Sequence, residues 1–181
     1  MKAVRKCVTA ILLAGLVMLA GSTIHAAWSN DPAVNLPVTD SPQRQYAHHL
    51  CNTPDGGYVV VWTTVDPVKA LGKEEGDGIF VQEFNGDGDR VWGDEGVQVC
   101  FDTMSGCGPR VCSDGTGGAF VAWQDYRGGH TTVYGQRVSS TGVPQWASGG
   151  ILISQNGYIA SNPSLVADGG EGAFVGWRYY E

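Results

Sequence analysis

Beyond residues 1–26 the sequence has few basic side chains. The whole chain holds 11 Lys and Arg against 18 Asp and Glu, and three of the basic residues, Lys2, Arg5 and Lys6, belong to the leading segment. The remaining part therefore carries a formal net charge of about −10. A surface with this excess of acid repels phosphate backbones, so we expect no nucleic-acid partner.

The local signatures of common catalytic and metal sites are also missing. The sequence contains no Ser-His-Asp order, no phosphate-binding glycine loop and no CxxC pair of the kind that holds zinc. Adjacent His48 and His49 would point to opposite faces of a strand, so they cannot bind one metal together. We therefore expect no cofactor, no metal and no catalytic residue within these 181 residues.

The segment at 1–26 has the layout of an export signal. Basic residues precede an uncharged apolar run of about 15 residues, and small residues follow as far as Ala26. Such a run is shorter than the roughly 20 residues that span a bilayer. We expect cleavage after Ala26, no membrane span in the mature chain, and a protein that is secreted, periplasmic or at the cell surface.

Four cysteines remain after this cleavage, and an even number permits disulfides in an exported chain. Cys100 and Cys107 are separated by six residues and form the predicted pair. Cys51 and Cys112 occupy the same register in neighbouring repeat units, where we expect a separation beyond the roughly 4.4–6.8 Å between Cα atoms that a disulfide accepts. Buried free thiols are the alternative.

A short phrase occurs twice in the second half of the chain. “DGTGGAFVAW” runs from Asp114 to Trp123, and “DGGEGAFVGW” runs from Asp168 to Trp177. A third version, “CNTPDGGYVVVW”, lies upstream, and “IFVQEFNGDGDRVWGDEGVQVC” aligns without gaps on “VYGQRVSSTGVPQWASGGILIS”. Residues at shared positions include Trp62, Trp92, Trp123, Trp146, Trp177, Gly118 and Gly172. We expect the tryptophans to pack in the core, with Trp62, Trp123 and Trp177 at equivalent buried positions.

Within each copy, short apolar runs alternate with turns rich in glycine and aspartate. “PRVCS”, “AFVAWQDY”, “TVYGQRV” and “GILIS” are too short for helices and predict four antiparallel strands. Four strands in about 54 residues, repeated in tandem, indicate an all-β protein built from β-propeller blades. The apolar second strand faces a neighbouring blade on both sides, so one blade alone cannot bury it.

This pattern divides the chain into five parts. They are a signal peptide at 1–26, an N-terminal segment at 27–42 with a strand that completes the last blade, a first blade at 43–104, a second blade at 105–158, and a partial third blade at 159–181. Propellers need roughly four to eight blades, whereas about two and a half are present. We therefore expect an N-terminal fragment of a longer closed propeller.

The repeat resembles the tandem propeller repeats of secreted bacterial proteins, with units of the type GGAxVAWxDxR, YxQRV and GxxxW. The resemblance covers about residues 28–181. Gly88 before Trp92 and Gly142 before Trp146 are similar to the tryptophan-docking turn of quinoprotein propellers. The resemblance implies a fold, and the function expected with it is a non-catalytic scaffold that recognises a glycan, protein or surface partner. The open alternative is the N-terminal part of a secreted glycoside hydrolase or quinoprotein-like enzyme whose active residues lie beyond residue 181.

Partner contacts are expected in the connection between the second and third strands, since only this connection changes length between copies. It has 16 residues from Thr63 to Gly78 and nine from Gln124 to Thr132, and such insertions are places where recognition can be added to a fixed scaffold. The candidate ligand-binding residues are Asp125, Tyr126, Arg127, His130, Lys73 and Glu74. The alternative is a set of solvated loops in which Asp125 and Arg127 form a structural salt bridge at the rim.

Two further patterns have simpler interpretations. Asp87 and Asp89 in “NGDGD” suggest a calcium loop, but the aligned turn “SSTGV” has no acid. An ordinary hairpin is therefore the preferred interpretation. The “RYYE” sequence at 178–181 has the Tyr and Glu of a sialidase nucleophile. That chemistry also needs three arginines that converge on a carboxylate, and several arginines of this chain lie at repeat positions. The catalytic interpretation is therefore not preferred.

Overall fold

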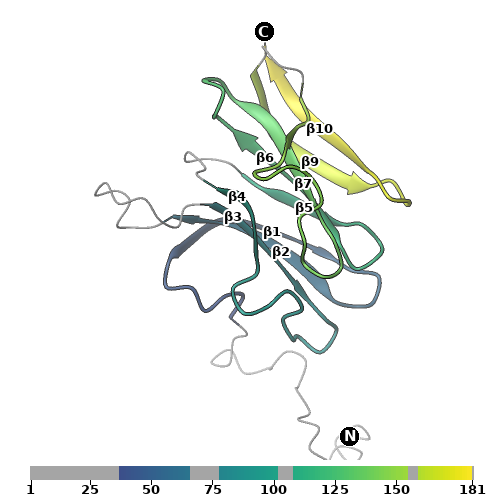
Figure 1. The fold of residues 1–181 in the computed structure, drawn as a ribbon. Helices are drawn as coiled ribbons and strands as arrows, with labels where there is room; N and C mark the ends of the chain where they lie inside the picture. Colours follow the sequence, from purple (N-terminus) through teal and green to yellow (C-terminus); the bar gives the residue numbers. More distant parts are fainter. Residues whose placement is uncertain (1–36, 66–77, 102–107, 155–158, 181) are drawn as a thin grey trace, which may run out of the picture.

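A computed structural model describes residues 37–65, 78–101, 108–154 and 159–180 of the chain (Figure 1). The described elements are strands: β1 (Arg44–Asn52), β2 (Tyr58–Val65), β3 (Gly78–Phe84), β4 (Val97–Phe101), β5 (Arg110–Ser113), β6 (Ala119–Asp125), β7 (Thr132–Val138), β8 (Ile151–Leu152), β9 (Ile159–Ala167) and β10 (Ala173–Tyr180). Every strand pair is antiparallel, and no helix occurs among these residues. The all-β prediction is confirmed.

The strands form three sheets that stack on one another. The first sheet has the order β1-β2-β3-β4, the second β5-β6-β7-β8, and the third contains β9 and β10. Strand β5 packs against β1 and β2, and β9 packs against β5, β6 and β7, so the second sheet lies between the other two (Figure 1). Among the described residues this stack is open and does not close into a ring.

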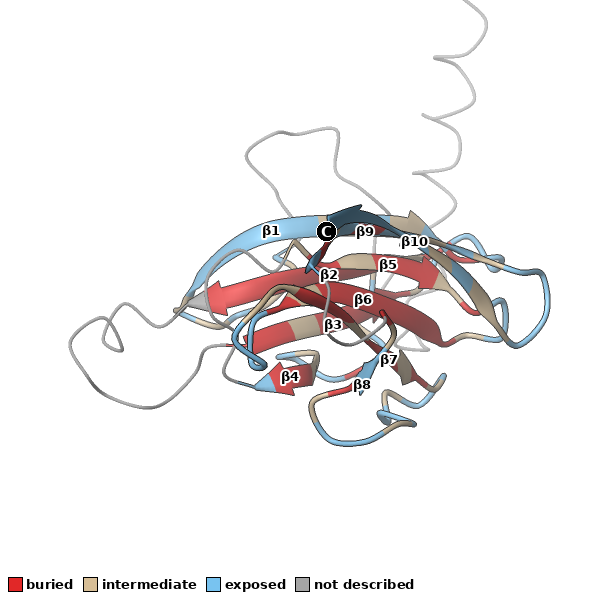
Figure 2. Cartoon of the chain, turned by 90° about the horizontal axis from the view of Figure 1, so that it is seen from above, coloured by how far each residue is buried: buried red, intermediate tan, exposed pale blue. Residues whose placement is uncertain are grey.

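The main core lies between the first and second sheets. Val59 and Val61 of β2 are fully buried there, together with Val121 and Trp123 of β6. Figure 2 shows that β2 and β6 are buried along most of their length. Because both strands lie in the middle of a sheet that has apolar contacts on both faces, they are apolar runs with little alternation.

In the second and third sheets, an aspartate fixes the glycine-rich turn between the first two strands. The Asp114 carboxylate accepts a hydrogen bond from the Gly118 amide at 2.8 Å, and Asp168 accepts one from Gly172 at 3.1 Å. A Cβ atom at Gly118 would collide with the carbonyl oxygen of Val138. The phrase “DGTGG” therefore needs both its aspartate and its last glycine.

A buried glutamine fixes the turn between the third and fourth strands in the same way in both complete sheets. The Gln82 side-chain oxygen accepts a hydrogen bond from the Trp92 amide at 2.9 Å, and Gln136 accepts one from Trp146 at 2.8 Å. Both glutamines are fully buried. They satisfy backbone groups that the bending chain leaves without strand partners.

Trp92 connects the first sheet to the second. Its indole Nε1 donates to the carbonyl oxygen of Ser140 at 3.2 Å, and its ring packs on Gly142 in the β7–β8 turn. Trp92 is buried, whereas Trp146 at the matching position is half-buried. Among the described residues, the third sheet has no matching turn against which Trp146 packs.

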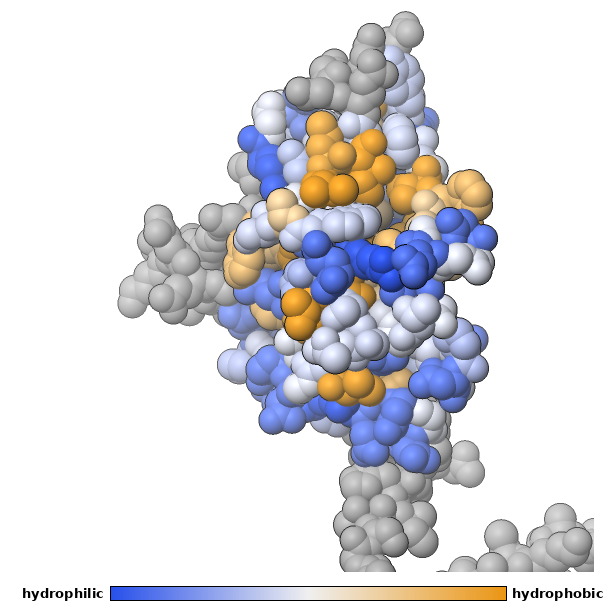
Figure 3. Space-filling view, turned by 45° about the vertical axis from the view of Figure 1, so that its right-hand side comes forward, coloured by the Kyte–Doolittle hydropathy of each residue, from blue (hydrophilic) through white to orange (hydrophobic). Residues whose placement is uncertain are grey.

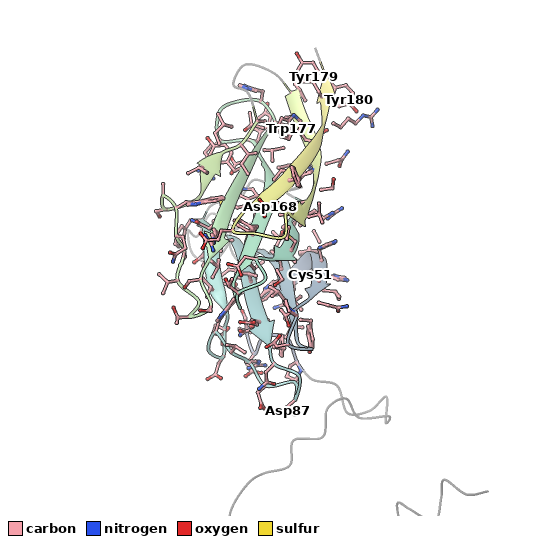
Figure 4. All side chains as sticks on the ribbon, turned by 90° about the vertical axis from the view of Figure 1, so that its right-hand side faces the viewer. Cys51, Asp87, Asp168, Trp177, Tyr179 and Tyr180 are labelled. Carbon is pink, nitrogen blue, oxygen red and sulfur yellow. The ribbon has the colours of Figure 1, made fainter. Side chains whose placement is uncertain are left out.

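The expectation of three equally buried tryptophans is wrong for one of them. Trp62 and Trp123 are 2% and 0% exposed, whereas Trp177 of β10 is 37% exposed (Figure 4). The Trp62 ring stacks on Phe80 and the Trp123 ring on Tyr134, both from the third strand of their sheet. The described part of the third sheet has only two strands, so it offers no such partner.

Candidate functional site

The structure describes four of the six candidate ligand-binding residues. Asp125, Tyr126, Arg127 and His130 lie at the end of β6 and in its connection to β7. Lys73 and Glu74 lie outside the described residues. We call the stretch from Asp125 to Thr132 the β6–β7 rim.

Asp125 and Arg127 form the salt bridge that the sequence suggested. Arg127 Nη2 lies 2.6 Å from Asp125 Oδ2, and Arg127 Nε donates to Oδ1 at 2.8 Å. The Trp123 indole also donates to Oδ2, at 3.0 Å. Burial by itself raises the pKa of Asp125, but the hydrogen bonds from Arg127 and Trp123 outweigh it and the pKa is lowered. The carboxylate is therefore ionised and fully engaged inside the fold.

Arg127 joins the β6–β7 rim to its surroundings. Nη2 also donates to the carbonyl oxygen of Gly149 at 2.9 Å, and the guanidinium lies over the Tyr134 ring, 4.0 Å from its centroid. The same nitrogen lies 3.4 Å from the Cys100 sulfur in the first sheet. The hydrogen bond to Asp125 is the main reason that the pKa of Arg127 is raised. Its side chain is 40% exposed, so one edge still reaches solvent.

Tyr126 is the most exposed large side chain of the β6–β7 rim. It is 50% exposed, and its carbonyl oxygen accepts the Gly129 amide at 3.0 Å to close a tight turn. The Thr132 hydroxyl donates to the backbone oxygen of Asp125 at 3.2 Å on the other side of the loop. His130 is half-buried, and its Nε2 is buried without a hydrogen-bond partner among the described residues. A rigid loop thus presents one tyrosine and the edge of one arginine.

The two adjacent histidines point to opposite sides of the first sheet, as expected. The backbone bulges between Tyr46 and His49. His49 Nδ1 accepts a hydrogen bond from the Val111 amide of the second sheet at 3.4 Å, whereas His48 lines a groove on the other face. Burial is the main reason that the pKa of His49 is lowered.

The “NGDGD” segment is a hairpin turn, which agrees with the preferred interpretation. Asn85 Oδ1 accepts hydrogen bonds from the amides of Asp87 and Asp89 at 3.0 and 2.8 Å. No group of three His, Cys, Asp or Glu side chains within the described ranges is arranged to hold a metal ion.

Among the described cysteines, Cys51 and Cys112 are free thiols. The expectation that Cys51 and Cys112 are not bridged is confirmed, while the predicted pair with Cys100 involves Cys107, which lies outside the described residues. Burial is the main reason that the pKa of Cys51 is raised and that of Cys112 is raised to about 11.

Sequence reasoning missed a hollow at the opposite end of β6. It has a volume of about 630 Å³ and is lined by residues 51–54, 112–116 and parts of 166–171. These are the ends of the first strands and the turns that follow them in all three sheets. The alignment of the three copies already placed these segments in one register, and this was the signal that could have revealed the hollow.

Comparison with known proteins gives no relative: no family model, curated protein or solved structure matches this chain. The part of the chain that the structure describes contains no helix able to span a membrane.

Proposed function

We propose that this chain is a non-catalytic, exported recognition scaffold of the β-propeller type that binds an extracellular glycan or protein through the β6–β7 rim. The observation that carries this proposal is the position of Tyr126, half exposed on a loop that Asp125 and Arg127 hold in one conformation. Aromatic and arginine side chains are enriched at binding hot spots. A loop that is already ordered loses little entropy when it binds.

The chemistry of the rim favours binding over catalysis. Asp125 is the acid of this loop, and its two carboxylate oxygens accept hydrogen bonds from Arg127 and Trp123. Neither oxygen is positioned to receive a proton from a substrate. The exposed parts, the Tyr126 ring and one edge of the Arg127 guanidinium, suit stacking and hydrogen bonding to a partner.

The propeller part of the proposal is supported by the matching contacts of successive sheets. The glutamine contacts of Gln82 and Gln136 and the aspartate turns at Asp114 and Asp168 recur at aligned positions of the repeat. A closed ring needs roughly four to eight sheets, so it requires more sheets than the three described, from the same polypeptide or from another one. The export signal that we infer at 1–26 supports an extracellular destination.

The alternative function is the N-terminal part of a secreted enzyme whose active residues lie beyond residue 181. The two hypotheses differ in where a ligand contacts this chain. A substrate of such an enzyme would depend on residues outside it, whereas the partner of a scaffold would be lost on changes at the β6–β7 rim.

The test is a binding screen of the chain starting at Ala27, against glycan arrays and extracellular protein panels. Tyr126→Ala should weaken binding of a genuine partner at least tenfold, as expected for a hot-spot residue. Tyr46→Ala is the matched control, since Tyr46 is 47% exposed on β1, and it should leave affinity unchanged. If every partner found binds Tyr126→Ala as tightly as the unaltered chain, the β6–β7 rim is not the site.

A further inference from the structure

The turn that joins β3 to β4 contains an asparagine followed directly by a glycine. Asn85 is half-buried and Gly86 is exposed. Figure 4 shows Asp87 at the tip of this turn, at one end of the molecule, and Figure 3 shows many hydrophilic side chains at that end. A glycine after asparagine has no Cβ atom to hinder its backbone nitrogen from approaching the asparagine side chain. The turn therefore combines access to solvent with a sequence that favours attack of the backbone on the side-chain amide.

The attacking group of such a reaction is the backbone nitrogen of Gly86. Within the described residues its amide donates no hydrogen bond, because other groups close the hairpin. The Asn85 amide donates to the carbonyl oxygen of Asp89 at 3.0 Å, and the Gly88 amide donates to the carbonyl oxygen of Asn85 at 3.0 Å. The Gly86 nitrogen can therefore lose its proton without breaking a hydrogen bond of the turn.

The group that would be attacked, the side-chain amide of Asn85, is polarised by the same turn. Its Oδ1 atom accepts hydrogen bonds from the amides of Asp87 and Asp89 at 3.0 and 2.8 Å. Attack on Cγ places negative charge on Oδ1, and donors that already point at this oxygen stabilise such charge. The side-chain nitrogen, which must leave, donates to Asp89 Oδ2 at 3.3 Å, a long and therefore weak hydrogen bond.

The other asparagines of the described ranges do not offer this arrangement. Asn162 precedes Pro163, which has no N–H group and cannot act as the nucleophile. Asn52 precedes Thr53, whose branched side chain crowds the backbone and whose amide already donates a hydrogen bond within its own turn. The structure therefore distinguishes Asn85 from both.

We propose that Asn85 is a site of spontaneous deamidation in the folded protein. The Gly86 nitrogen bonds to Asn85 Cγ, the bond from Cγ to the side-chain nitrogen breaks, and that nitrogen leaves as ammonia with the proton that Gly86 loses. Water then opens the cyclic imide. Addition at Cγ gives aspartate, whereas addition at the backbone carbonyl carbon gives isoaspartate, in which the chain runs through the side chain. This inference depends on the β3–β4 turn and is independent of the ligand proposed for the β6–β7 rim.

The two products should affect the first sheet differently. Both place a new negative charge beside Asp89, but an aspartate still offers an oxygen to the two amides that Asn85 now binds. Isoaspartate adds one carbon to the backbone and displaces the hydrogen bonds that close the hairpin. Phe84 and Arg90 pair directly on either side of this turn, and Arg90 also binds Asp40 at 2.7 Å. Isoaspartate should therefore loosen the attachment of the segment around Asp40 to the first sheet.

The test compares the folded chain starting at Ala27 with the same chain unfolded in urea, both held at pH 8 in water labelled with heavy oxygen. Peptide mass spectrometry locates each labelled residue and separates aspartate from isoaspartate. In the folded chain Asn85 should be converted at a rate within about tenfold of its rate in urea, while Asn52 and Asn162 keep their amides. A lower folded-state rate at Asn85 would overturn the proposal, because the turn would then protect the side chain.

A substitution at the nucleophile tests the mechanism. Gly86→Ala should slow conversion of Asn85 by about tenfold or more, because the added methyl group crowds the attacking nitrogen. The fold should remain, since the nearest atom to a Cβ at this position would be 3.8 Å away. Gly128→Ala is the matched control, with a nearest atom at 4.0 Å, and should leave the rate unchanged. Equal rates in the two variants would contradict attack by the Gly86 nitrogen.

Separation of the products tests their different effects. The isoaspartyl form, purified by ion exchange from an aged sample, should unfold at a lower temperature than Asn85→Asp, which carries the same charge with a normal backbone. Equal unfolding temperatures would overturn the predicted effect on the hairpin.

Discussion

The Trp92 indole nitrogen lies 3.2 Å from the carbonyl oxygen of Ser140 and joins two successive sheets of the stack. The contact unites a turn of the first sheet with the equivalent turn of the second. It shows how a tryptophan repeated along the chain can hold successive sheets in register. A residue with this role contributes to sheet stacking as well as to the core of its own sheet.

Trp92→Phe should lower the free energy of unfolding by about 1 kcal/mol or more, because it keeps most of the buried ring and removes the hydrogen bond to Ser140. Trp146→Phe is the matched control and should cost less, since Trp146 is half-buried. Urea unfolding of both variants measures the difference. Equal losses for the two would contradict a special role of Trp92 between the sheets.

Gly118→Ala should destabilise the fold by about 1–3 kcal/mol, because the added methyl group meets backbone and carboxylate atoms that have no room to move. Gly128→Ala is the control, since its nearest atom would be His130 Cε1 at 4.0 Å. Thermal unfolding compares the two variants. A Gly118→Ala protein as stable as Gly128→Ala would show that the turn can relax.

The thiols of Cys51 and Cys112 should react slowly with a thiolate-selective reagent at pH 8 while the protein is folded. Burial holds their pKa values above the ordinary range, to about 11 for Cys112, so little thiolate is present at that pH. In urea both should react at the rate of a free cysteine. Rapid labelling of native Cys112, identified by mass spectrometry, would contradict the buried environment.

Much of the fold could be predicted because its local rules are written in the sequence. The strands around Trp123 follow from short apolar runs bounded by glycine turns, whereas the hydrogen bond from the Gly118 amide to the Asp114 carboxylate required the structure. The exposure of Trp177 could not be predicted, because it depends on which strands flank β10 and not on the local sequence. The Asp125–Arg127 pair was anticipated by spacing, but its bond to the Trp123 indole required the fold.

The environment of Glu83 also lay beyond sequence reasoning. Glu83 aligns in the repeat with Arg137, which in the second sheet bonds to Asp114 at 3.1 Å and lies over the Phe120 ring. The first sheet therefore has an acid at a position where the second has a base. Thr53 occupies the position that corresponds to Asp114. The first sheet therefore has neither the arginine nor the aspartate of the ion pair that Arg137 and Asp114 form in the second sheet.

Glu83 is 4% exposed, and its environment makes stability depend on pH. Burial is the main cause that raises its pKa to about 7, and the charges of Asp55 and Asp114 add to the effect. Because the folded state holds this proton more tightly than the unfolded state, the contribution of Glu83 to the unfolding free energy should be highest below pH 4.5. It should fall as the pH rises through 7 and level off above that value.

Glu83→Gln removes the ionisation and keeps the shape of the side chain. Near pH 4 the variant should match the unaltered protein, whereas at pH 8 it should be more stable by on the order of 1–2 kcal/mol, since each pKa unit is worth about 1.4 kcal/mol and partial solvation reduces the total. Urea unfolding between pH 4 and 8 measures both proteins. If the unfolding free energies of the two proteins change in parallel with pH, with no gain for Glu83→Gln at pH 8, the Glu83 carboxylate is solvated or paired. Its charge then does not oppose the packing of the first two sheets.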